Sequence, residues 1–279
     1  MGVAVSQAPS LAAGGLLHPA RRSPRTPAPP NCAEREFAGR GVRLRGWQCR
    51  AISARRGTIV SLHGVADNRD SSIGVIRRFI TQGFDVVAYD SRAHGASEGD
   101  LCTYGYFEKD DLRRVIDTLP PGPVVLMGTS LGGAVALQEA ATDERISAVI
   151  AAEVFSDLET IARDRAPFFL VGPLLARAFR HAERRGGFSV GAVSPVDAAR
   201  RIHVPVLLIH GEADIQTPPE HSRRVFDALA GPKRLILVPD AGHNHSLRDP
   251  GLWTLIETWI GDVLEQAGTP DTPSEVKSK

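Results

Sequence analysis

The sequence predicts an α/β protein with a mostly parallel central sheet flanked by helices, and two observations carry this prediction. Strand-like apolar runs alternate with stretches of helical periodicity along the chain. The strand-like runs are continuously apolar rather than alternating, which is typical of strands buried on both faces of a parallel sheet. Because ligands of such sheets bind at the carboxyl ends of the strands, we expect catalytic or binding residues in the loops that follow the strands.

The elements follow from composition, spacing and stop signals. Strands are expected at residues 57–64, 84–90, 123–128, 146–153, 204–211 and 233–240. Helices are expected at residues 71–83, 108–119, 131–142, 222–230 and 250–267. Gly83 stops the first helix, and a pair of prolines stops the second, which carries acidic residues in its first turn.

One domain, residues 34–267, is expected to contain this pattern. Within it, residues 156–195 have no strand-like run and are expected to form a small helical cap of two or three short helices. The cap carries Arg163, Arg165, Arg177, Arg180, Arg184 and Arg185, a face that is either solvated or attractive to an anionic substrate or lipid surface. Residues 1–33 are expected to be a disordered leader and residues 268–279 a disordered tail.

Composition narrows the function classes. The 279 residues are 42% hydrophobic with a formal net charge of +1, so no nucleic-acid partner is expected. No apolar run approaches the roughly 18 residues of a membrane span. We expect a cytoplasmic protein, with an exported or N-terminally anchored form as the alternative. Association with a membrane surface is not indicated, and the sequence says nothing of oligomeric state.

The three cysteines are sparse. They form no CxxC pair, which argues against a structural zinc site. The odd count does not indicate a disulfide framework, although Cys49 and Cys102 remain a candidate pair.

A glycine-rich turn carries the first catalytic candidate. Gly128-Thr129-Ser130-Leu131-Gly132 follows an expected strand and opens an expected helix. A serine on such a sharp strand-to-helix turn is typical of a nucleophile elbow, where small flanking residues let the helix pass close to its neighbours. The positive end of the helix also favours negative charge that develops beside Ser130.

An acid and a base should follow the nucleophile in that order. Asp214 lies just past one strand, and Glu212 competes with it. His243 lies in the glycine turn after the next strand, and His245 competes with it. A different interpretation takes Asp240, His243 and His245 as metal ligands, but it leaves the serine and Asp214 without a role.

An anion hole needs two backbone N–H groups. Leu131, directly after the nucleophile, should supply one of them. Val65 should supply the other, because it follows His63-Gly64 in the loop after an earlier strand. His63 itself is interpreted as structural.

With these residues placed, the chain resembles the α/β-hydrolase superfamily over about residues 37–266. Within it, the chain is similar to the bacterial group of serine aminopeptidase-like and monoacylglycerol-lipase-like hydrolases. The matching pieces are LHGVADNRDS, DVVAYDSRAHGASEG, TYGYFEKDD, MGTSLGG, HGEADIQTP and AGHNHS. The resemblance implies the same five site residues: Ser130, Asp214, His243, Val65 and Leu131. It also implies that Asp90, Arg92 and His94 fix a loop.

The resulting hypothesis is a serine hydrolase that cleaves a small-molecule carboxylic ester through an acyl-enzyme, with no metal or organic cofactor. Two alternatives stay open. One is an aminopeptidase or amidase of the same fold, which would want an acidic group near the cap to hold a substrate ammonium. The other is a non-catalytic binding protein on a hydrolase scaffold.

Overall fold

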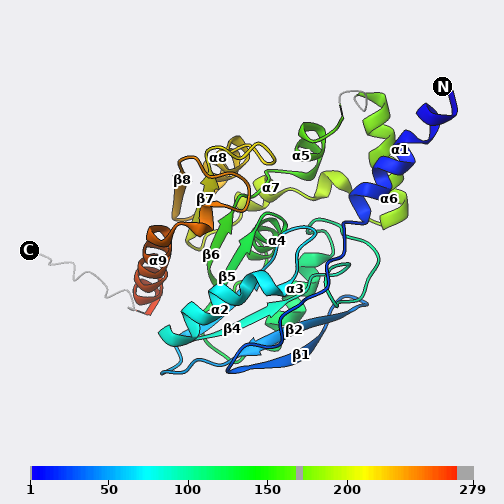
Figure 1. Cartoon of the computed structure of the whole chain (residues 1–279). Helices are drawn as coiled ribbons and strands as arrows, with labels where there is room; N and C mark the ends of the chain where they lie inside the picture. The colour runs from blue at the N-terminus through cyan, green and yellow to red at the C-terminus, as the bar shows by residue number, and fades with distance from the viewer. Residues whose placement is uncertain (1, 168–171, 269–279) are drawn as a thin grey trace, which may run out of the picture.

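Eight strands form a single sheet in the order β1-β2-β4-β3-β5-β6-β7-β8 (Figure 1). The computed structural model describes residues 2–167 and 172–268. The strands are β1 Cys32–Ala38, β2 Arg43–Cys49, β3 Gly57–Leu62, β4 Phe84–Tyr89, β5 Val124–Thr129, β6 Ile146–Ala152, β7 Val206–Gly211 and β8 Lys233–Val238. From β4 through β8, neighbouring strands pair in parallel, so the predicted mostly parallel sheet is confirmed.

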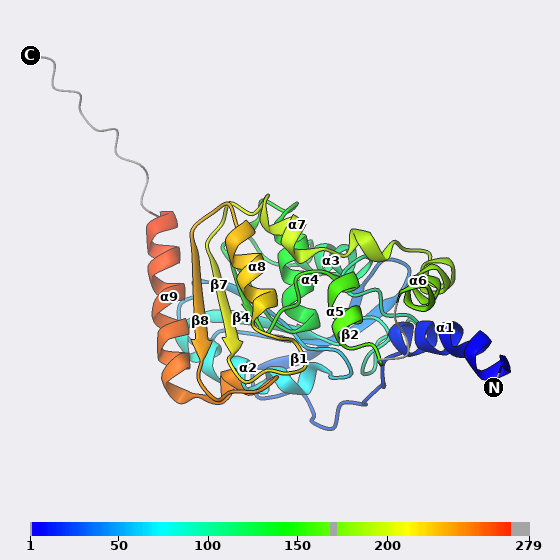
Figure 2. The same ribbon diagram turned by 90° about the horizontal axis from the view of Figure 1, so that it is seen from above.

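Helices cover both faces of this sheet (Figures 1 and 2). They are α1 Gly2–Leu17, α2 Ile73–Phe79, α3 Glu108–Ile116, α4 Leu131–Ala140, α5 Leu158–Asp164, α6 Pro173–Gly186, α7 Pro195–Ala199, α8 Glu220–Ala228 and α9 Pro250–Gly268. Apolar residues of α2 and α9 pack on one face of the sheet, and those of α3, α4, α7 and α8 pack on the other. The β3–β7 strands are therefore buried on both sides, as their largely apolar sequences predict.

An antiparallel hairpin, β1–β2, completes the sheet at one edge and was absent from the expected strands. Four consecutive residues of β1, Ala33–Glu36, are exposed, and three of these four are charged. Charges of this kind protect an edge strand from pairing with another chain. They also leave the strand without the apolar run by which the other strands were predicted.

The candidate pairing of Cys49 with Cys102 is wrong. Cys49 forms a disulfide with Cys32, its direct cross-strand partner in the hairpin, whereas Cys102 is buried and free. The pairing depends on the register of two strands that were not predicted, so the spacing of the cysteines did not reveal it.

The N-terminal segment differs from the disordered leader that composition predicted. Residues 2–17 form α1, which packs against α6 far from the sheet (Figures 1 and 2). Ala13 and Leu17 are buried, and the Leu17 carbonyl accepts a 2.9 Å hydrogen bond from the Cys102 amide. The segment is ordered by Cys102, which lies 85 residues beyond Leu17, and by α6, which begins at Pro173. Local composition cannot report such distant partners.

Helices α5 and α6 occupy the segment between β6 and β7 for which a cap was predicted. Part of that segment, residues 168–171, lies outside the described residues. The predicted tail lies outside them from residue 269 onward. Among the described helices, none is long and apolar enough to cross a membrane.

Candidate active site

Ser130 is on a strained turn between β5 and α4. Its φ of 52° and ψ of −113° lie in a region that non-glycine residues rarely adopt. The turn is held by the Ser130 amide, which donates to the Ala152 carbonyl on β6 over 2.8 Å, and by the first hydrogen bond of α4. This is the geometry of a nucleophile elbow, and it sets the serine at the positive end of α4.

The elbow requires glycine at position 132 for steric reasons. A Cβ atom there would overlap the backbone carbonyl oxygen of Leu62 on β3. Neither the helix nor the strand can move away cheaply, because both are fully buried in the core.

We expect Gly132→Ala to lower the free energy of unfolding by roughly 1–3 kcal/mol, since overpacking against backbone forces the elbow apart. Urea unfolding followed by circular dichroism measures this loss. Gly74→Ala in α2 is the matched control, because its Cβ would meet nothing within 4 Å and should stabilise the helix. Equal midpoints for the two variants would contradict the steric argument.

Asp214 and His243 are brought together from the ends of β7 and β8. His243 donates its Nδ1–H to Asp214 Oδ2 over 2.7 Å. The carboxylate is fully buried and only 6% of the imidazole side chain is exposed. The bond holds the proton on Nδ1, so Nε2 keeps a free lone pair that can accept a proton.

Several donors stabilise the Asp214 carboxylate. The amides of Gln216 and Thr217 both donate to Oδ1 over 2.9 Å. His210 also lies beside Asp214, with its Nε2 atom 3.4 Å from Asp214 Oδ2. The same Nε2–H donates to the Thr217 carbonyl over 2.7 Å. Burial opposes ionisation, but the hydrogen bonds from His210, His243 and Thr217 outweigh it and hold the pKa of Asp214 well below its usual range. His210 was not among the predicted site residues.

Glu153 is a second residue that sequence reasoning missed. It follows β6, is fully buried, and accepts hydrogen bonds from the amides of Asn244 and Ser246 and from the Ser246 hydroxyl. These bonds fasten the loop that carries His243 to the strand whose Ala152 carbonyl holds Ser130. A single acid at the end of an apolar strand was the available signal.

His63 orients the peptide between Gly64 and Val65. Its Nε2 accepts the Ser91 amide over 2.9 Å, so its Nδ1 carries the proton and donates to the Gly64 carbonyl over 2.7 Å. In a trans peptide the C=O and the next N–H point in opposite directions, so the bond aims the Val65 N–H away from His63. Gly64 also lies close to Ser130, because a Cβ there would be 3.6 Å from Ser130 Cβ.

We expect His63→Gln to lower kcat by about tenfold to a hundredfold, since the longer amide reaches Ser91 but not the Gly64 carbonyl. His63→Asn should retain most of the activity, because its amide nitrogen replaces Nδ1. Comparing kcat and KM of the two variants separates positioning from stability, provided that both unfold at similar temperatures. A loss of kcat as large in the Asn variant would contradict the assignment.

The loop that was expected to be fixed by Asp90, Arg92 and His94 has dense internal bonding. Asp90 accepts from the Arg69 and Ala96 amides, each over 2.8 Å. Arg92 forms two 2.7 Å hydrogen bonds to a buried aspartate of α3, and His94 bonds the Arg92 carbonyl. Burial and the neighbouring His63 lower the pKa of His94 to about 4, which keeps this imidazole neutral.

The competing residues lie elsewhere. Glu212 and His245 are exposed, whereas the acid and the histidine that bond each other across these two loops are Asp214 and His243. In the described part of the chain, Asp240, His243 and His245 do not gather as a group that could hold a metal ion, so the metal interpretation is wrong.

The loops that carry the candidate residues border one cavity of about 620 Å³. Its lining includes Gly64 and Val65, then Thr129 next to Ser130, Gln216 beyond Asp214 and Asn244 next to His243. The strand-end loops after β3, β5, β7 and β8 therefore converge on a shared space.

Comparison with known proteins agrees with this architecture. Residues 57–192 match the family model for the alpha/beta hydrolase fold, and residues 186–260 match the model for TAP-like protein. The protein YfhR of Escherichia coli K12 is 31% identical over 236 residues, which cover 80% of this chain and 77% of that protein. The chain belongs to the α/β-hydrolase superfamily.

Other similarities give this α/β hydrolase its context. YqkD of Bacillus subtilis is 33% identical over 196 residues, which cover 67% of this chain and 64% of that protein. YqkD and YfhR are both named as uncharacterized proteins. Among solved structures, the Pyrococcus furiosus esterase Pf2001 has a TM-score of 0.68 at 22% identity, covering 88% of this chain and 98% of that one. Acetyl xylan esterase 1 of Thermoanaerobacterium has a TM-score of 0.63 at 20% identity, covering 93% of each chain.

Proposed function

We propose that this α/β hydrolase cleaves carboxylic esters through an acyl-enzyme, with Ser130 as nucleophile, His243 as general base and Asp214 as the orienting acid. The observation that carries the proposal is the 2.7 Å hydrogen bond between His243 and the buried Asp214 carboxylate, at the sheet edge where Ser130 occupies its strained turn. A base that is oriented by a carboxylate, at the same sheet edge as an elbow serine, is the arrangement that can activate a hydroxyl at neutral pH.

The reaction would proceed in two steps. His243 Nε2 takes the Ser130 proton as Oγ attacks the ester carbonyl, and the imidazolium is stabilised by Asp214. The N–H groups of Leu131 and Val65 bind the oxyanion, and the proton then passes to the departing alcohol. Water, activated by the same imidazole, attacks the acyl-enzyme and releases the acid. Each oxyanion donor contributes roughly 3–4 kcal/mol in comparable sites.

Two features support ester substrates. The structural neighbours Pf2001 and acetyl xylan esterase 1 carry esterase names, and they share the fold with this chain. The molecule also has two cavities of different character: one of mixed polarity beside Gly64 and Val65, and an apolar one between α1 and the cap. Such a pair suits an ester, whose acyl and alcohol parts differ in polarity.

The proposal is tested with p-nitrophenyl esters from acetate to palmitate, run beside L-aminoacyl p-nitroanilides. We expect ester hydrolysis to exceed anilide hydrolysis. We also expect a fluorophosphonate to inactivate the enzyme with one equivalent bound, and mass spectrometry of the digested protein to locate the adduct on Ser130. Anilide turnover above ester turnover would favour the aminopeptidase alternative. A labelled residue other than Ser130 would refute the mechanism, and absence of both labelling and turnover would favour a binding protein.

A further inference from the structure

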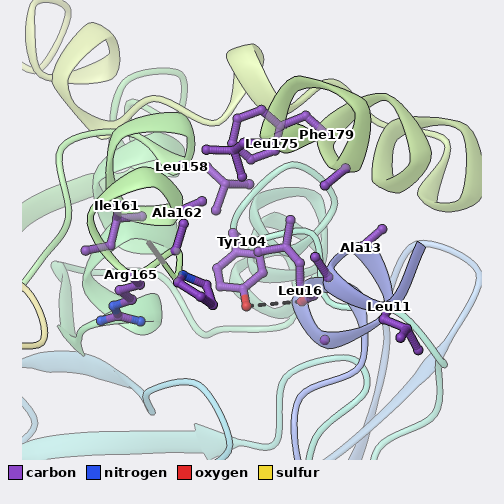
Figure 3. Close-up of a pocket in the computed structure, with 15 residues that line it drawn as sticks. Leu11, Ala13, Leu16, Tyr104, Leu158, Ile161, Ala162, Arg165, Leu175 and Phe179 are labelled. Carbon is purple, nitrogen blue, oxygen red and sulfur yellow. Dashed lines mark hydrogen bonds between the residues drawn. The ribbon is translucent and has the colours of Figure 1, made fainter. Parts of the chain in front are cut away.

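A second cavity, of about 590 Å³, lies between the N-terminal helix α1 and the cap (Figure 3). Leu158, Ile161 and Ala162 of α5 form one wall, and Leu175 and Phe179 of α6 form another. Leu11, Ala12, Ala13, Gly15 and Leu16 of α1 close the remaining side. The volume falls in the range of small-molecule sites, which is roughly 300–1,000 Å³.

The lining of this cavity is apolar. Leu158, Ile161 and Ala178 are each at most 4% exposed, so they form a firm wall rather than a loose surface. Arg165 is the one charged side chain among the described residues that line the cavity. A cavity lined in this way favours the binding of a hydrocarbon chain, because apolar surface removed from water contributes favourably to the free energy of binding.

Two residues that line the cavity contact residues close to the catalytic candidates. Arg165 donates to the Gln216 carbonyl and the Thr217 hydroxyl, each over 2.8 Å, in the loop whose amides bind Asp214. Tyr104, on the floor of the cavity, packs edge-on against Phe155, just beyond the strand that holds Ser130.

Helix α1 is fastened in place as a wall. The Tyr104 hydroxyl donates to the Leu16 carbonyl over 3.1 Å, as Figure 3 shows, and the buried Leu17 lies against the core. Next to them, His18 Nδ1 donates to the Asp100 carbonyl over 2.7 Å. This wall precedes residue 57, where the match to the hydrolase family model begins, so it is a feature of this chain and not of that model.

We propose that the α1–cap cavity binds the acyl chain of a medium-length ester, between hexanoyl and dodecanoyl, and that α1 limits the length accepted. The inference rests on the proposed esterase function and names the substrate class of that site. The acyl chain extends from Ser130 past Tyr104 into the α1–cap cavity, while the alcohol part occupies the cavity beside Gly64 and Val65.

The test compares kcat/KM for p-nitrophenyl acetate, butanoate, octanoate, dodecanoate and palmitate in the wild type, Ala12→Trp and Ser10→Trp. Ala12 lines the cavity from α1, whereas Ser10 is an exposed residue of the same helix outside the lining. We expect Ala12→Trp to lower the octanoate-to-acetate ratio by about tenfold or more, because each methylene kept out of an apolar pocket costs roughly fourfold in binding. Ser10→Trp should leave the ratio unchanged.

Ala162→Trp fills the cavity from α5 and keeps the test decisive if the first variant folds poorly. An unchanged ratio in both folded variants would overturn the proposal. Calorimetric titration of Ser130→Ala with decanoate separates the two proposals. If the wild type hydrolyses no ester, the esterase function fails, yet decanoate binding that Ala12→Trp weakens would still support the cavity. Absence of decanoate binding would then overturn it.

Discussion

Ser130→Ala is expected to lower kcat for p-nitrophenyl esters by at least about 10⁴-fold, because it removes the hydroxyl that is proposed to attack the ester carbonyl. The side chain is lost without a change in backbone demand, since alanine and serine meet the same steric cost at a φ of 52°. Steady-state rates measure the loss, and circular dichroism checks that the fold is retained.

The sharpest control is the absence of a burst. Wild-type enzyme should release one equivalent of p-nitrophenol rapidly if deacylation is slow, whereas Ser130→Ala should release none. A variant that retains more than a hundredth of the wild-type rate, after contaminating esterases have been excluded by active-site titration, would refute Ser130 as nucleophile.

Asp214→Asn is expected to lower kcat by about 10⁴-fold with little change in KM, as an equivalent substitution does in another serine hydrolase. Asparagine can still accept from the Gln216 and Thr217 amides through its oxygen. Its NH₂ group then faces His243 Nδ1 and forces the imidazole proton onto Nε2, the nitrogen that must receive the Ser130 proton. The substitution therefore keeps the shape of the site and reverses the tautomer.

Glu212→Gln is the matched control for this variant. Glu212 is exposed and only two residues away, and it was the competing candidate in the sequence. We expect its activity to stay within about twofold of wild type, as for most surface substitutions. A larger loss in Glu212→Gln than in Asp214→Asn would assign the acid to position 212 instead.

Local signals were enough to predict the parallel part of the sheet. Continuous apolar strands, helix stops such as Gly83, and a serine between glycines are properties of short segments, and the structure places them close to their expected bounds. The β1–β2 hairpin was not predicted, because its exposed, charged residues form no apolar run. Helix α1 was not predicted, because its Leu17 is buried by residues that lie far along the chain.

The candidate site, like the fold, could be predicted from the sequence only in part. The order of serine, acid and histidine along the chain could be read from the ends of successive strands, since parallel strands bring their carboxyl ends to one edge. The supporting roles depend on how the chain folds back. Glu153 bonds Ser246, 93 residues further along, and His63 accepts from Ser91, 28 residues further along. His210 bonds Thr217 only seven residues away, but its place beside Asp214 is set by the fold of the loop between them.

The sequence by itself therefore determined the class of fold, the strand ends where chemistry could occur and the residue types available there. The tertiary structure alone decided which acid and which histidine meet, that Cys49 pairs with Cys32, and that α1 closes a cavity beside the cap. The physical reason is range. Propensity and periodicity act over a few residues, whereas pairing, burial and cavity shape depend on contacts between segments that only folding brings together.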